Sequence, residues 1–110
     1  VHVQSLESLG SASMTEAEAV MITLFAELVL GECYFDAKMS NAALEGAVVV
    51  NFELDSGGRM NGSELVIDAL RSERFRECAL QAFASSVIPR VQSAPVLDTR
   101  MTVIFASDER

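Results

Sequence analysis

Two cysteines, Cys33 and Cys78, are the residues of this chain whose chemistry most needs deciding. They lie on segments that we expect to be separate helices, so they cannot form the vicinal dithiol of a C-x-x-C redox motif. A bridge between them would close a loop of roughly 46 residues and stabilise the fold by about 4 kcal/mol on chain-entropy arithmetic. Free cysteine is itself among the most buried residue types. The residues alone leave two alternatives open, a disulfide or two buried thiols.

The sequence contains no recognisable set of catalytic residues. The histidine His2 stands near the start of the chain without a candidate partner, and the acidic residues occupy cap, helix-surface and turn positions. No G-x-S-x-G elbow, phosphate-cradling glycine loop or cluster with metal-ligand spacing occurs. We therefore predict no catalytic residue, no metal and no cofactor. A thiol enzyme or redox sensor using Cys33 or Cys78 is a less favoured alternative, because no nearby histidine would activate the thiol.

Length and charge restrict the class of partner. A chain of 110 residues that is 50% hydrophobic predicts one domain that folds alone. Its net charge of −8 would repel nucleic acid and an anionic membrane surface. The longest apolar stretch, residues 19–30, is too short for direct membrane insertion, which needs about 20 apolar residues. No signal peptide is visible and the chain begins at Val1, so we expect a fragment of a larger protein.

The first third of the chain predicts an arm and a long helix. Residues 1–13 are polar and small, which is typical of an ordered arm or a linker. Ser13 and Thr15 each precede a Glu by three residues, so overlapping capping boxes predict a helix start near Thr15. The helix is expected to run to about Ser40 or to break at Gly31. Its apolar face should be substantially buried and comprises Ala17, Val20, Met21, Ile22, Leu24, Phe25, Leu28 and Val29, continued by Cys33, Tyr34, Phe35 and Met39.

A β-hairpin is predicted next. Residues 46–54 alternate at the two-residue period of a strand, and the core face carries Val48, Val50, Phe52 and Leu54. A second strand is expected over residues 59–67, with a bulge at Gly62. The hairpin turn between the two strands consists of Asp55, Ser56, Gly57 and Gly58.

A second helix and a last strand complete the chain. Ser72 is the expected N-cap, and Pro89 lies beyond the end of the helix. The predicted order is α-β-β-α-β, an α+β domain over residues 14–106 with helices on a three-stranded antiparallel sheet and a tail over 107–110. The helix stripe consists of Phe75, Cys78, Ala79, Ala82 and Phe83, and the last strand runs from Thr99 to Phe105.

Several of these segments together resemble a known family. The AgmX/PglI C-terminal domain family has a Cys-Tyr helix end, a Leu-x-Gly-x-Val-x-Val-x-Phe strand, a glycine turn, and a helix that carries a second Cys before a Pro. The resemblance covers about residues 16–105. This family resembles the TonB C-terminal domain of an envelope-spanning energy transducer, and members occur in gliding-motility proteins of myxobacteria. The matching residues here are Cys33-Tyr34, Leu44 to Phe52, Gly58, Cys78, Ala82 and Pro89.

The resemblance implies a TonB C-terminal-like fold, a disulfide between Cys33 and Cys78, and a periplasmic domain of an inner-membrane-anchored protein. Partners would be envelope proteins of a motility or transport complex, bound through a periplasmic or outer-membrane segment. We predict a non-catalytic module, monomer or weak dimer, that binds by β-strand addition at a sheet edge. The alternative is a cytoplasmic or envelope structural domain that dimerises through its first helix. The predicted edge consists of Thr99, Arg100, Met101, Thr102, Val103, Ile104 and Phe105.

Overall fold

The chain folds into an antiparallel sheet with helices packed against it. The computed structural model describes residues 1–91 and 93–106, and the tail predicted for 107–110 lies outside them. In chain order the elements are β1 (His2–Ser8), α1 (Glu16–Phe25), the π-helical turn η1 (Ala26–Leu30), α2 (Gly31–Lys38), β2 (Gly46–Leu54), β3 (Met60–Asp68), α3 (Glu73–Ser85) and β4 (Leu97–Phe105).

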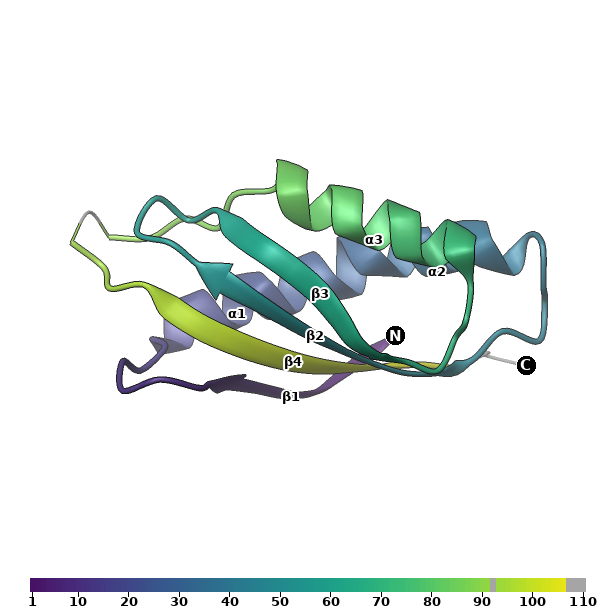
Figure 1. The fold of residues 1–110 in the computed structure, drawn as a ribbon, viewed down its shortest axis with the longest axis horizontal. Helices are drawn as coiled ribbons and strands as arrows, with labels where there is room; N and C mark the ends of the chain where they lie inside the picture. The colour runs from purple at the N-terminus through teal and green to yellow at the C-terminus, as the bar shows by residue number, and fades with distance from the viewer. Residues whose placement is uncertain (92, 107–110) are drawn as a thin grey trace.

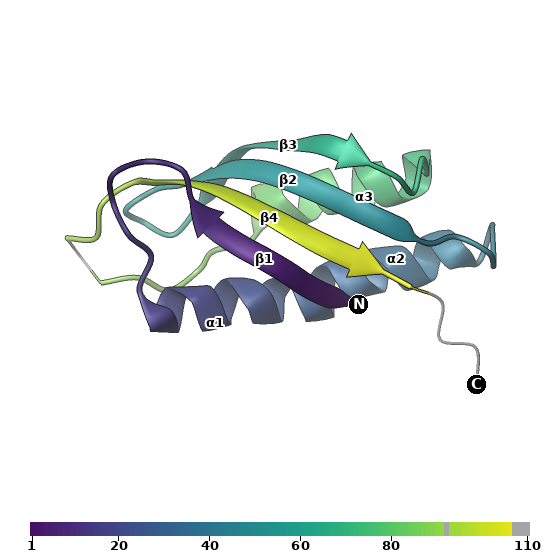
Figure 2. The ribbon, with the colours of Figure 1, turned by 90° about the horizontal axis from the view of Figure 1, so that it is seen from below.

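The strands form one sheet in the order β1-β4-β2-β3. β2 pairs with β3 across the hairpin and with β4 along its whole length, from Gly46 opposite Phe105 to Leu54 opposite Leu97. All helices lie on one face of this sheet, as the two views show (Figure 1 and Figure 2). The predicted α+β class, with helices on an antiparallel sheet, is confirmed.

The sheet has one strand more than the sequence predicts. The segment expected to be an arm or linker contributes β1, which pairs antiparallel with β4. The register of this pair shifts between Val3 and Ser5, so that the half-buried Val3 and Leu6 stand three residues apart. A bulge of this kind disrupts the two-residue period by which a strand is recognised. That irregularity explains why the pattern analysis missed β1.

The first helix is continuous through Gly31. α1, η1 and α2 follow one another without a gap from Glu16 to Lys38. The predicted capping box is formed by Thr15 and Glu18: the Thr15 hydroxyl accepts from the Glu18 amide at 3.1 Å, and the Glu18 carboxylate accepts from the Thr15 amide at 3.0 Å. Because the helix continues without a gap to Lys38, the predicted break at Gly31 is wrong.

The predicted burial of this helix is only partly right. Against the sheet lie Ile22, Phe25, Ala26, Leu30, Cys33, Tyr34 and Ala37. In contrast, Leu28 is 65% exposed and Met39 84% exposed. A helix packed on one face of a sheet buries one stripe of its surface. Because apolar residues extend around more than that stripe, a second group remains exposed: Val20, Met21, Leu24, Leu28, Phe35 and Met39.

Aromatic rings join the helices to the sheet. Phe83 of α3 packs between Phe25 and Phe52, with ring centroids 5.0 and 5.2 Å away. Phe105 of β4 contacts both Tyr34 and Phe75, each with a centroid distance of 5.0 Å. These pairs confirm the predicted inward faces of α3 and β2.

Candidate functional site

Cys33 of α2 and Cys78 of α3 form a disulfide, with their Cα atoms 5.6 Å apart. The pairing that the family resemblance implies is confirmed. Neither cysteine is free. The alternative of a nucleophilic thiol, which needs a free thiolate, is therefore not supported. An exposed ion pair between Arg74 and Asp36, 2.7 Å apart, joins the same two helices.

The strand chosen as the partner-binding edge, Thr99–Phe105, lies inside the sheet. β4 pairs with β1 on one side and with β2 on the other. The prediction that residues 99–105 form an edge is therefore wrong. The reason is β1, which occupies the position beside β4 that a three-stranded sheet would leave open.

Within the described part of the chain, the edges of the sheet are β1 and β3. The two edges differ in polarity. β1 exposes polar side chains such as Gln4 and Glu7, whereas β3 exposes Val66 at 47% and Ile67 at 55%. The predicted irregularity at Gly62 is present, because Gly62 has a φ of +60° and the register with β2 shifts beside it. β3 thus combines a row of unpaired backbone groups with exposed apolar side chains.

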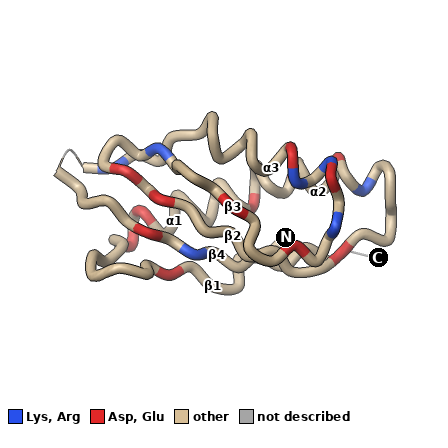
Figure 3. The backbone as a smooth tube through the Cα atoms, in the orientation of Figure 1, with Lys and Arg blue, Asp and Glu red and all other residues tan. Residues whose placement is uncertain are grey.

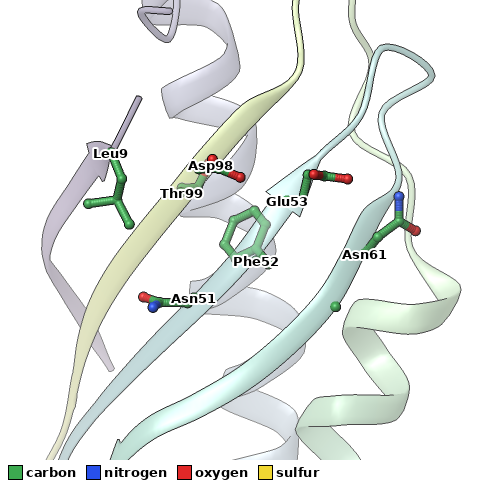
Figure 4. Close-up of a pocket in the computed structure, with 8 residues that line it drawn as sticks. Leu9, Asn51, Phe52, Glu53, Asn61, Asp98 and Thr99 are labelled. Carbon is green, nitrogen blue, oxygen red and sulfur yellow. The ribbon is translucent and has the colours of Figure 1, made fainter. Parts of the chain in front are cut away.

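A hollow of about 390 Å³ lies beside the start of β3, over β2 and β4 (Figure 4). Glu53 and Asp98 stand directly opposite each other in the β2–β4 ladder and both line it, together with Asn51 and Asn61. The two carboxylates attract a cationic group by charge alone. Among the residues that the structure describes, no group of three or more His, Cys, Asp or Glu is placed to hold a metal ion.

The predicted hairpin turn at Asp55, Ser56, Gly57 and Gly58 is confirmed and is organised by Asp55. One carboxylate oxygen accepts hydrogen bonds from the amides of Gly57 at 3.0 Å and Arg59 at 2.9 Å, and the other accepts from the Asn61 side chain at 2.9 Å. The hydrogen bond from the Arg59 amide is the main cause that lowers the pKa of Asp55. The turn holds the start of β3 in a fixed position next to the hollow.

The segment after α3 is bonded to this turn. The Ile88 amide donates to the Gly58 carbonyl at 2.7 Å. Arg90 donates to the Asp55 carbonyl at 2.9 Å and to the Glu18 carboxylate at 2.7 Å. Burial acts to raise the pKa of Glu18, but the hydrogen bonds from Arg90 and Thr15 outweigh it and the net shift is downward. The sequence does not indicate this pair, because its members lie 72 residues apart and no motif joins them.

His2 lies exposed on β1. Among the described residues, no helix is both long and apolar enough to cross a membrane. The features of the described residues that face outward include the sheet edges β1 and β3 and a group of apolar side chains.

No family model and no curated protein matches the chain. Among solved structures, the chain is similar to the solution NMR structure of the Pseudomonas aeruginosa TonB CTD. The two are 27% identical, and the alignment covers 66% of this chain and 77% of that one with a TM-score of 0.45. The α+β architecture of this chain is shown by its own sheet order and register. Membership of the AgmX/PglI family is not confirmed.

Proposed function

We propose that this domain is a non-catalytic interaction module that binds an extended segment of a partner protein along β3. The observation that carries the proposal is the position of β3, which pairs with β2 on one side only. An added strand gains affinity from backbone hydrogen bonds and specificity from alternate side chains. The exposed Val66 and Ile67 offer apolar contacts to such a segment.

The start of β3 is held in position by the hairpin turn that precedes it. The hairpin turn fixes its first residues through Asp55, and helix α3 follows directly after it along the chain. A rigid edge lowers the entropy lost on binding, because the receiving strand is ordered before its partner arrives. β1 is less suited, because its exposed side chains are polar.

The proposed setting is the periplasm, in a protein anchored in the inner membrane and belonging to a gliding-motility or transport complex. The Cys33–Cys78 disulfide supports an oxidising compartment, since such bonds are rare in the cytosol. The resemblance to the AgmX/PglI family suggests envelope proteins as partners. As part of the same proposal, the parent protein transduces energy within that complex.

The proposal is tested with an extended peptide. A random peptide library is selected on the oxidised domain, and the best binder is resynthesised with N-methyl groups on either of its two alternating sets of backbone amides. In an added strand only every second amide faces β3. One methylated set should therefore abolish binding, while the other leaves it within a few-fold of the parent peptide.

Two results would count against strand addition. A peptide that tolerates both methylated sets is held by side chains alone, and one that loses binding with both is not bound as a strand. A domain carrying Ile67→Lys, compared with the exposed loop variant Val96→Lys, locates the contact. Only the first substitution should weaken the selected peptide.

A further inference from the structure

An apolar groove runs along the outer side of the first helix. Its centre is a hollow of about 380 Å³ between α1 with η1 and the segment that follows α3. Leu24 and Leu28 line it from the helix, and Val87 and Ile88 line it from the other side. Leu28 and Val87 are 65% and 56% exposed. Contiguous exposed apolar side chains of this kind mark interaction sites more often than isolated ones do.

Two neighbouring hollows extend the groove in both directions. One shares Leu24 with the centre and reaches Glu16 at the start of α1. The other shares Val29 with the centre and reaches Glu32 of α2. With a rise of 1.5 Å per helical residue, the two acidic ends stand about 24 Å apart. We call the three adjoining hollows the helix groove.

Every charge on this part of the helix is negative. No Lys or Arg occurs in residues 1–37, and basic residues lie further along the chain (Figure 3). Glu16, Glu27 and Glu32 are exposed on the helix, whereas Glu18 is buried and paired with Arg90. The helix groove is therefore apolar at its centre and acidic at its two ends, where Glu16 and Glu32 line it.

We propose that the helix groove binds a cationic amphipathic helix of a partner protein, about four turns long, with leucine-like side chains at its centre and Lys or Arg towards its ends. Val20, Leu24 and Leu28 recur at four-residue intervals and form a ridge, which is the surface that packs between the side-chain rows of a second helix. Basic end residues would meet Glu16 and Glu32. No residue that lines the helix groove belongs to β3.

Charge complementarity favours a basic helix over two other ligands of an apolar helix face, a second copy of this chain and an anionic lipid surface. A second copy would bring an equally acidic groove against the first, and like charges across an interface are costly. An anionic lipid surface would be repelled for the same reason. A helix with basic residues satisfies both the apolar centre and the acidic ends.

The test uses two synthetic helical peptides of about 16 residues and equal apolar content, one of Leu and Lys, the other of Leu and Glu. Each is titrated into the isotopically labelled, oxidised domain. The Leu/Lys peptide should shift the amides of residues 20–29 and 86–88 and bind at least about tenfold more tightly than the Leu/Glu peptide. Its affinity should fall as salt is raised.

Matched variants test whether the Leu/Lys peptide binds in the helix groove. Leu28→Lys should weaken the Leu/Lys peptide by about tenfold or more, while Val96→Lys, which makes the same change on an exposed loop residue, should leave it within about twofold. Glu16→Gln with Glu32→Gln should weaken it and flatten the salt dependence. Glu7→Gln with Glu45→Gln removes the same charge elsewhere and should do neither.

Several results would overturn the proposal. Equal affinity for both peptides would show that charge does not select the occupant. Shifts confined to the sheet would place the site elsewhere. A dimer of the domain alone that Leu28→Lys converts to a monomer would identify a second copy as the occupant. Binding to anionic vesicles without binding to the Leu/Lys peptide would identify a lipid surface.

Discussion

Glu18, in the first turn of α1, and Arg90, beyond the end of α3, form a buried ion pair with an N–O distance of 2.7 Å. Their side chains are 6% and 1% exposed. Arg90 also donates to the Asp55 carbonyl, so one side chain joins the start of the first helix, the hairpin turn and the segment after α3. These three parts of the chain lie far apart in the sequence. The position of β3 depends on this junction.

Replacing Arg90 should destabilise the domain strongly. Arg90→Met leaves the Glu18 carboxylate buried without its partner, and breaking a buried pair in this way costs about 3–5 kcal/mol. The control is Arg74→Met, which breaks a pair of the same 2.7 Å distance between half-exposed side chains. Exposed pairs of this kind contribute little to stability, because solvent screens them. Urea unfolding of both variants checks this, and equal losses would contradict the role assigned to Arg90.

The stability of the domain should fall in mild acid, in part through Glu18. Its pKa in the folded state lies below the ordinary value of 4.5. A carboxyl lowered in this way adds stability above its unfolded pKa and loses that contribution as pH falls through the folded pKa. The difference in unfolding free energy between the wild type and Glu18→Gln should therefore shrink as the pH is lowered from about 4.5. A difference that stays constant over that range would show that Glu18 does not titrate with folding.

Gly58 should not tolerate a side chain. Its φ is +89°, and a Cβ atom would overlap the backbone carbonyl of Ile88. Gly58→Ala should therefore cost about 2–4 kcal/mol, since the backbone on both sides has to shift. Gly57→Ala is the matched control, because a Cβ there meets only the Asp55 carboxylate at 3.5 Å. Thermal melts of the two variants should differ clearly, and similar melting temperatures would contradict the geometry of this turn.

Reduction of the disulfide should lower the stability of the domain by about 4 kcal/mol, because the bond closes a long loop. The bridge spans 45 residues and joins α2 to α3. The double variant Cys33→Ala with Cys78→Ala should unfold at the same urea concentration with or without reductant. A wild-type protein that is equally insensitive to reductant would show that the bond does not form.

The regular parts of the fold could be predicted from the sequence. The capping box of Thr15 and Glu18, the alternation of β2 and the hairpin turn are local patterns, and each depends on residues within a few positions of one another. The pairing of Cys33 with Cys78 came from the family resemblance, because spacing alone left it open. All of these features are confirmed by the structure.

The features that could not be predicted depend on contacts between residues that lie far apart in the sequence. The bulge in β1 removes the two-residue period, and without β1 the strand β4 is mistaken for an edge. The sequence shows more apolar residues on the first helix than a small sheet can cover, but it does not show that Leu24 and Leu28 are among those left exposed. The partner of Arg90 lies 72 residues away, and no local pattern indicates it.

Hydrogen exchange of the β3 backbone amides shows whether β3 receives the partner segment. The selected extended peptide is bound to the oxidised domain, and exchange is followed residue by residue over 63–67 with and without it. On an edge strand the outward-facing amides exchange quickly, and pairing should slow them by about tenfold or more. Protection of alternate β3 amides is the predicted result. Unchanged exchange along β3, with protection appearing on β1 or the helix groove instead, would contradict the account.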